Sequence, residues 1–196
     1  MKKDGFTLIE LLVTIVVLAI MTMVAIPVFA TWLPNYRLRA SVRDLYSSFQ
    51  LAKIAAIRKS MNCTITFNQA IGAKNYDYVV YVDADNDLRY DANATADGVD
   101  NDEDGSVDEA GESEKVLTMV SFADRYDGVS FDTTQGGGDG ITFTPNVDGL
   151  PSLAFRSNGI PIMPGSGIGN GTVFLINTKN TTMSVVVARM GNIRIQ

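Results

Sequence analysis

The sequence predicts an α+β protein in which one long N-terminal helix, with a transmembrane first half, packs on an antiparallel β-sheet head. Residues 11–36 contain no charged side chain, and residues 38–56 carry one apolar stripe at helical spacing. After residue 61 the chain turns to short alternating or apolar segments that are separated by turn residues. One helical region followed by a run of strands is typical of the α+β class.

The first half of the predicted helix is long and apolar enough to cross a membrane. Its strongly apolar part is residues 11–30, and 20 residues at ~1.5 Å each span ~30 Å, the thickness of a bilayer core. Because Lys2 and Lys3 precede this part, the positive-inside rule places the N-terminus in the cytoplasm and the remainder of the chain beyond the membrane.

The second half of the helix is predicted from an apolar stripe whose members lie three or four positions apart. The stripe consists of Leu38, Val42, Leu45, Phe49, Ala52 and Ala56. Pro27 and Pro34 each remove a backbone donor, so we expect a kink or a loosened turn between them in one helix over residues 6–60. Basic side chains off the stripe indicate a solvated face, and contact with lipid headgroups or nucleic acid is the alternative.

Seven strands are predicted in the head from alternation and from short apolar runs. They are residues 63–67, 78–82, 116–122, 141–144, 173–176, 183–188 and 193–195. Residues 177–181 and 190–192 have the composition of hairpin turns. Cys63 is expected to be a buried, inert strand residue.

The composition excludes several kinds of active site. The chain has no histidine and one cysteine, which excludes His-ligated zinc, Ser–His catalysis and an intrachain disulfide. No nucleophile, base and orienting group occur together in a recognisable pattern. We therefore expect a structural subunit that is not an enzyme and has no small-molecule substrate.

The net charge of −6 is distributed unevenly along the chain. Residues 83–114 contain thirteen acids and one base, a net charge of −12, whereas the other 164 residues carry nine acids and fifteen bases, a net charge of +6. One acidic insert therefore determines the sign of the charge in an otherwise mildly basic chain.

The acidic insert contains a partial EF-hand-type loop that begins at Asp100. Carboxylates occupy its positions 1, 3, 5 and 9, and Gly105 at position 6 permits the sharp turn. Position 12 is Gly111 rather than glutamate, so Glu109 or Glu112 would close the shell. Oxygen ligands of this kind favour Ca²⁺. The predicted ligands are Asp100, Asp102, Asp104, the Ser106 carbonyl, Asp108 and Glu112.

A less complete copy of the loop lies upstream in the insert. Asp83, Asp85, Asp87 and Asp91 occupy the same four positions, and Leu88 stands where the glycine is expected. The two loops could also share one site. The alternative is an acidic segment without a cation, kept soluble by its charge.

The N-terminus resembles the class III signal of type IV pilins and pseudopilins. Gly-Phe-Thr-Leu-Ile-Glu fills residues 5–10, directly before the apolar helix. The resemblance implies that prepilin peptidase cuts after Gly5, that Phe6 becomes the N-methylated first residue, and that Glu10 meets the N-terminal amine of a neighbouring subunit. In a dry helix bundle such an ammonium and carboxylate neutralise each other, whereas either alone is costly.

Two other interpretations of the N-terminus remain open. A secretory signal would be cut after Ala30, although the apolar run is long for such a signal. A plain membrane anchor leaves Glu10 unexplained, because a carboxylate at the edge of the hydrocarbon costs a few kcal/mol unless it is paired.

The head resembles the H-type minor pseudopilin family (GspH/FimT) of type II secretion systems and type IV pili. The resemblance lies in the order of segments 51–64, 155–161, 171–176 and 185–194, and it implies one helix packed on two β-sheets. It covers most of the chain except about residues 83–139. Members that take up DNA tend to end in Gly-Arg-x-Arg, and Asn192 replaces the first arginine here, so nucleic acid is not expected as a partner.

The resemblance implies a minor pseudopilin of the type II secretion system, which assembles into the periplasmic pseudopilus for export across the outer membrane. The alternatives are a minor pilin of a type IV pilus, for adhesion, motility or DNA uptake, and an unpolymerised membrane-anchored calcium-binding protein. The expected partners are other pilin or pseudopilin subunits, prepilin peptidase and the inner membrane.

The predicted organisation has four parts. Residues 1–5 are a leader that is removed, residues 6–30 a transmembrane and filament-core helix, residues 31–60 its amphipathic continuation, and residues 61–196 a periplasmic head with the insert 83–114. The chain would be a single-pass protein of the inner membrane in a Gram-negative-type envelope.

Overall fold

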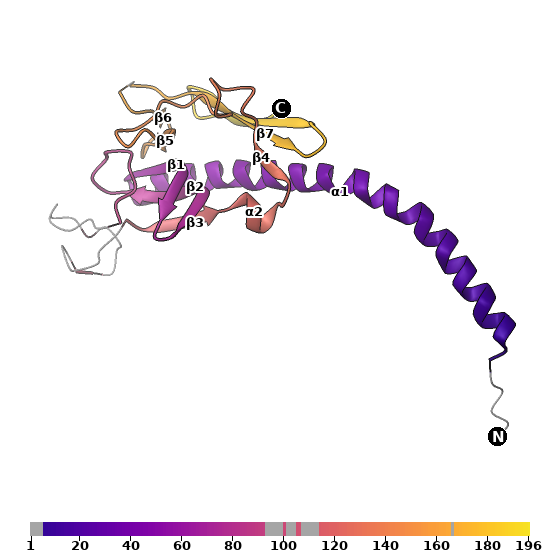
Figure 1. The fold of residues 1–196 in the computed structure, drawn as a ribbon. Helices are drawn as coiled ribbons and strands as arrows, with labels where there is room; N and C mark the ends of the chain where they lie inside the picture. The colour runs from indigo at the N-terminus through magenta and orange to yellow at the C-terminus, as the bar shows by residue number, and fades with distance from the viewer. Residues whose placement is uncertain (1–5, 93–99, 101–104, 107–113, 166) are drawn as a thin grey trace.

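The computed structural model describes residues 6–92, 100, 105–106, 114–165 and 167–196. A long helix, α1 (Leu8–Lys59), leads into a head of two antiparallel sheets (Figure 1). The other elements are β1 (Asn62–Ile71), β2 (Lys74–Asp83), β3 (Val116–Val120), α2 (Phe122–Arg125), β4 (Val129–Phe131), β5 (Ser152–Phe155), β6 (Pro161–Ile162), β7 (Gly171–Asn177), β8 (Thr182–Val187) and β9 (Ile193–Ile195). This architecture confirms the predicted α+β class.

The C-terminal half of α1 lies between the two sheets (Figure 1) and shares one apolar core with both of them. The whole predicted stripe is buried: Leu38, Val42, Leu45, Phe49, Ala52 and Ala56. Phe49 packs edge-on against Phe143, with 6.0 Å between ring centroids, and Phe67 stacks on Phe143 at 5.7 Å. The helix therefore continues into the head because its apolar face completes the core.

The five-stranded sheet has the order β3-β2-β1-β5-β6, and the four-stranded sheet has the order β4-β7-β8-β9. Side chains alternate along β1, so that Cys63, Ile65 and Phe67 enter the core beside α1, while Thr64 and Thr66 face the other side of the five-stranded sheet. That outer face is also covered, because Thr64 and Thr66 are fully buried.

A loop that follows β2 covers part of this outer face. Leu88 lies in this loop and packs with Ala154 of β5 and Ile162 of β6 in a small second core. The Leu88 carbonyl accepts a hydrogen bond from Asn146 Nδ2 at 3.1 Å, which ties the loop to the segment before β5. Polar side chains of the outer face are thereby enclosed.

The N-terminal half of α1 projects away from the head as a bent rod (Figure 1). The helix is continuous through Pro27 and Pro34. The kink or loosened turn expected there does not interrupt the helix, and the rod that contains both prolines is bent (Figure 1). Within the described residues, α1 is the one helix long and apolar enough to cross a membrane.

Several predicted strand boundaries are wrong. Residues 141–144 make a single bridge, between Ile141 and Val173, rather than a strand. On the same edge of β7, β4 pairs from Leu175 onward, and this segment bonds to the part before it through the Thr142 amide and the Thr172 carbonyl, at 3.0 Å. The predicted strand 116–122 ends at Val120, because the Phe122 amide donates to Asp77 Oδ2 at 2.6 Å and begins α2. The short strands β4, β5 and β6 were not predicted.

The other strand predictions and both hairpin turns are confirmed. Strands β7 and β8 pair up to Ile176 and Thr182, with residues 177–181 forming the turn. Strands β8 and β9 are joined across Met190 and Gly191, where the Ala188 amide donates to the Asn192 carbonyl at 2.9 Å. Cys63 is fully buried in β1, as expected.

Candidate functional site

Helix α1 begins with a capping box formed by Thr7 and Glu10. The Glu10 amide donates to Thr7 Oγ1 at 3.3 Å, and the Thr7 amide donates back to Glu10 Oε2 at 2.8 Å. The Thr7 hydroxyl also donates to the same Oε2, at 2.8 Å. A carboxylate can accept about four hydrogen bonds, so Glu10 can cap its own helix and still accept a donor from another molecule.

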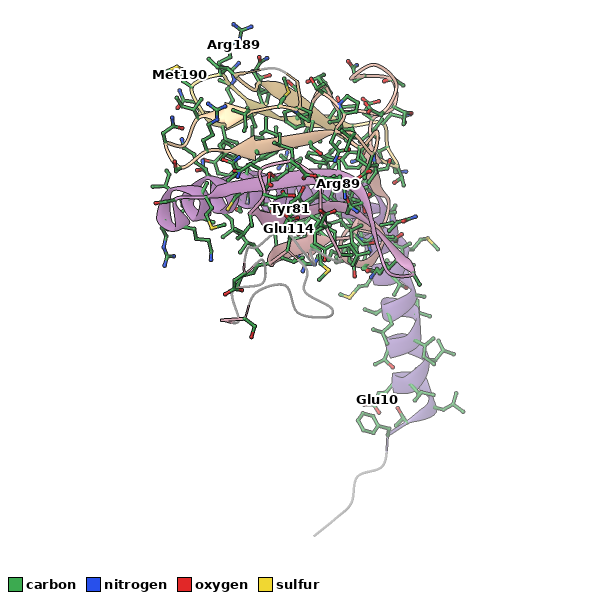
Figure 2. The ribbon with its side chains drawn as sticks, turned by 90° about the vertical axis from the view of Figure 1, so that its left-hand side faces the viewer. Glu10, Tyr81, Arg89, Glu114, Arg189 and Met190 are labelled. Atoms are coloured by element: carbon green, nitrogen blue, oxygen red, sulfur yellow. The ribbon has the colours of Figure 1, made fainter. Side chains whose placement is uncertain are left out.

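The surface around Glu10 is otherwise apolar. Phe6 is 91% exposed, and large apolar side chains stay exposed along the helix as far as Leu33. Glu10 is the one charged residue in the segment 6–36, and it lies at the free end of α1, far from the head (Figure 2). An exposed apolar surface of this extent marks a membrane or protein contact.

A second group of charged residues lies on the outer face of the five-stranded sheet. One carboxylate oxygen each of Asp83, Asp85 and Glu114 lies within 4.8 Å of the others, and the same holds for Asp85, Asp87 and Asp91. Asp85 belongs to both groups, so the five side chains form one carboxylate cluster. Figure 2 labels Glu114, Tyr81 and Arg89 in the head, away from Glu10 at the free end of α1.

Two oxygens of the carboxylate cluster are buried without a hydrogen-bond partner. Asp83 is fully buried, and its Oδ2 accepts from Thr64 Oγ1 at 2.7 Å and from the Leu88 amide at 3.2 Å. Glu114 is 2% exposed, and its Oε2 accepts from the Asp91 amide at 3.1 Å. In the part of the chain that the structure describes, Asp83 Oδ1 and Glu114 Oε1 have no donor.

Burial makes both of these carboxylates difficult to ionise. Burial raises the pKa of Asp83, and the nearby charges of Asp85 and Asp87 raise it further, against the hydrogen bond from Thr64. Burial likewise raises the pKa of Glu114, and the Asp83 charge adds to that shift. Among the described residues, no basic side chain lowers the pKa of Asp83 or Glu114 to offset these upward shifts.

Arg89, a basic residue next to the carboxylate cluster, pairs with the more exposed carboxylates. Arg89 forms an ion pair with Asp91, and its Nε lies 3.5 Å from an oxygen of Asp87 and 3.5 Å from one of Asp148. The buried oxygens of Asp83 and Glu114 therefore remain without a cationic partner.

The backbone brings Asp83 and Glu114 together because they end adjacent strands. Asp83 is the last residue of β2, and Glu114 lies two residues before β3, which pairs antiparallel with β2. The Val82 amide donates to the Lys115 carbonyl at 3.0 Å, and the Glu114 amide donates to the Asp91 carbonyl at 3.1 Å. These bonds close the neck of the insert, which we define as residues 82–91 and 114–115.

The N-terminal segment matches a known motif, because residues 1–26 fit the prokaryotic N-terminal methylation motif. That motif stands directly before the long helix that packs on antiparallel sheets. The N-terminal segment is therefore type IV pilin-like.

The chain is similar to two crystal structures of the type IV minor pilin FimU from Pseudomonas aeruginosa (strain PAO1). The first, in space group P21, has a TM-score of 0.41 at 11% identity and covers 83% of this chain and 90% of that chain. The second, in space group P65, has a TM-score of 0.39 at 12% identity and covers 81% and 92%. No curated protein sequence matches the chain.

The predicted ligands fall into two groups. Of the first group, Asp85 lies close to both Asp87 and Asp91, whereas Asp83 lies close to Asp85 and to Glu114. Of the residues predicted for the second loop, Asp100 and Ser106 are described, whereas four lie outside the described residues: Asp102, Asp104, Asp108 and Glu112. Among the predicted processing residues, Gly5 also lies outside them.

Both predicted loops have one hydrogen bond in common. The amide of the sixth residue donates to the carboxylate of the first, from Leu88 to Asp83 at 3.2 Å and from Gly105 to Asp100 at 3.0 Å. Leu88 adopts the left-handed conformation expected of a glycine there, with φ of 64°. Burial of its side chain offsets the strain of this conformation.

The sequence analysis missed Glu114 as a member of the carboxylate cluster. A signal was present, because predicted strands flank the insert on both sides and consecutive strands usually pair. Such pairing places the residues just inside both ends of the insert next to each other.

Proposed function

We propose that the chain is a minor pseudopilin of a type II secretion system, a filament subunit that is cleaved and then assembled through the N-terminal half of α1. The observation that carries the proposal is Glu10, the single charge within an exposed apolar rod that starts directly after the methylation-motif glycine. A rod of this kind needs a cover that is apolar along its length and cationic at Glu10.

Processing would supply that cation. Cleavage after Gly5 leaves Phe6 with a free α-amine, and N-methylation keeps that amine basic. In a filament, the amine of one subunit would pair with Glu10 of its neighbour, and the apolar side chains from Leu8 to Leu33 would pack against other helices. Both Thr7 donors use Oε2, so Oε1 can take the amine while the helix cap stays formed.

Before assembly, the same rod would hold the subunit in the inner membrane. Lys2 and Lys3 would keep the N-terminus in the cytoplasm, and the head would lie in the periplasm. The segments that support the H-type assignment lie at the end of α1 and the start of β1, between β5 and β6, in β7, and from β8 to β9.

The test separates the charge of Glu10 from its role as a helix cap. Glu10→Gln retains an acceptor for the Thr7 amide but cannot neutralise an amine, whereas Thr7→Val removes the hydroxyl of the cap and retains the carboxylate. We expect Glu10→Gln to lose incorporation into sheared filaments and Thr7→Val to retain it, with equal membrane levels of both variants on immunoblots.

Two results would contradict the filament proposal. One is normal incorporation of Glu10→Gln, and the other is an equal loss in both variants, which would reduce Glu10 to a helix cap.

Deletion of the gene then tests whether the subunit belongs to a type II secretion system or to a type IV pilus. Loss of exoproteins from the culture supernatant with normal surface pili supports the pseudopilin assignment, whereas loss of pili with normal secretion assigns the chain to a type IV pilus.

A further inference from the structure

We propose that the carboxylate cluster binds one Ca²⁺ at the neck of the insert, held between Asp83, Asp85 and Glu114. This site is independent of the filament proposal, because it uses head residues that neither processing nor helix packing involves. It also differs from the predicted loop at Asp100, since its third ligand comes from the far end of the insert.

The spacing of the oxygens fits a shared ion. Oxygens that each lie ~2.4 Å from one calcium ion are at most ~4.8 Å apart. One carboxylate oxygen from each of Asp83, Asp85 and Glu114 lies within 4.8 Å of the other two. Asp83 Oδ1 and Glu114 Oε1 make no hydrogen bond to each other or to any other group among the described residues, so both can face an ion between them.

The remaining hydrogen bonds orient these two carboxylates for that role. Thr64 Oγ1 and the Leu88 amide hold Asp83 through Oδ2, and the Asp91 amide holds Glu114 through Oε2. In each residue one oxygen is fixed by the protein and the other is left open. This division is typical of ligating carboxylates, whose second oxygen is hydrogen-bonded to the surrounding protein.

The charge of the cluster also favours a bound cation. Five carboxylates face one guanidinium, and Arg89 is engaged with Asp87, Asp91 and Asp148. A buried, ionised carboxylate without a partner is strongly unfavourable, so such groups are paired, bind a metal or take up a proton. A divalent ion between Asp83 and Glu114 neutralises both and lets Asp85 contribute from the exposed side.

The donor set selects the kind of ion. All the available ligands are carboxylate or backbone oxygens, which favour hard cations over zinc or copper. The ligands come from an irregular loop and a strand end, a variable geometry that suits Ca²⁺, whereas Mg²⁺ requires near-octahedral order at shorter distances. The outer carboxylates Asp87 and Asp91 are near enough to complete the shell directly or through water.

The ion would act as a clamp at the base of the insert. Asp83 and Asp85 lie at its beginning and Glu114 at its end, so one ion cross-links residues about thirty positions apart in the sequence. Asp83 also belongs to β2, which anchors the clamp to the five-stranded sheet. Calcium would therefore stabilise the head and fix where the insert leaves it.

The test uses full-length protein in detergent micelles, with metal ions removed by EDTA. Three carboxylates of the other predicted loop are first replaced, so that this loop cannot bind calcium. In the triple variant Asp100→Asn, Asp102→Asn, Asp104→Asn, calorimetric titration should show one Ca²⁺ per chain, with a Kd between ~10⁻⁵ and ~10⁻³ M. Adding Glu114→Gln to this background should weaken binding by at least ~tenfold. Mg²⁺ should bind more weakly than Ca²⁺ to the triple variant.

A matched control and a second readout keep the outcome interpretable. Asp127→Asn, added to the same background, removes a carboxylate that pairs with Arg37 outside the cluster, and Ca²⁺ affinity should not change. Glu114→Gln keeps an acceptor for the Asp91 amide, so it should fold, and its melting temperature in EDTA serves as the check. Ca²⁺ should raise the melting temperature of the background variant but not that of the variant carrying Glu114→Gln.

Three results would overturn the proposal. One is the absence of Ca²⁺ binding by the triple variant at millimolar concentration. Another is unchanged affinity after Glu114→Gln, which would place the ion elsewhere in the insert. The third is a melting temperature that Ca²⁺ does not alter in the triple variant, which would leave protons as the charge-neutralising partner of Asp83 and Glu114.

Discussion

The two halves of α1 have the same secondary structure but depend on different partners. The C-terminal half carries a narrow apolar stripe, and the head of the same chain buries all of it. The N-terminal half is apolar on every side, and almost none of its surface is covered by its own chain. A helix that is apolar all round is stable only where something else surrounds it.

This difference shows which half of α1 is covered by its own chain and which half needs other molecules around it. The distribution of apolar residues around the helix, rather than their number, separates a segment that folds into its own head from one that needs a membrane or neighbouring subunits. Substitutions along α1 should therefore change the stability of the head strongly in one half and hardly at all in the other.

The largest expected effect is at the centre of the buried half. Phe49→Ala removes a fully buried ring that contacts Phe67 and Phe143, so the free energy of unfolding of the head should fall by about 3–5 kcal/mol. The matched change Leu18→Ala, in the exposed half, should leave it unchanged. Urea unfolding of the full chain in detergent, followed by tyrosine near-UV circular dichroism, measures both values, and similar losses would refute the contrast.

A smaller effect is expected where α1 is tied to the head by a polar contact. Lys53 Nζ donates to the Gly191 carbonyl at 2.8 Å, which holds the turn between β8 and β9 against the helix. Lys53→Met keeps much of the packing of the stem and loses a charged donor, so we expect a loss of about 1–2 kcal/mol in unfolding free energy. Lys179→Met, on an exposed turn, is the control, and an equal effect of the two would argue against the tie.

The smallest effect is expected where the helix leaves the head. Arg37 Nη1 lies 3.0 Å from Asp127 Oδ2 and 2.8 Å from the Asp127 carbonyl, but the Asp127 side chain is 82% exposed. Solvent weakens such a pair, so Arg37→Ala should cost less than about 1 kcal/mol. A cycle with Asp127→Ala isolates the carboxylate contact, and a coupling well above this value would mean that the pair helps to hold the head to the rod.

The sequence predicted the helix better than the sheets for a physical reason. The stripe from Leu38 to Ala56 repeats over five turns, and each buried residue repeats the same local signal. Strand pairing depends on remote partners, so the alternation at residues 141–144 could not show that this segment meets β7 at a single bridge beside β4. The short strand β6 pairs at only two positions and has almost no periodic signal.

The carboxylate cluster shows the same limit. The spacing of Asp83, Asp85 and Asp87 is local, and the sequence predicted that these residues converge. Glu114 joins them only because β2 and β3 pair across the insert, and its burial depends on how the loop at Leu88 folds over the sheet. The prediction for the loop at Asp100 remains a prediction, since most of its ligands lie outside the described residues.

We infer that the mature protein begins at Phe6 and retains the exposed half of α1. Mass spectrometry of the N-terminal peptide from membrane-purified protein tests it most directly. We expect a chain that starts with N-methylated Phe6. A chain that retains Met1, or one that starts at Thr31 after a secretory cut, would contradict it, because the exposed rod would then be either an unprocessed anchor or absent from the mature protein.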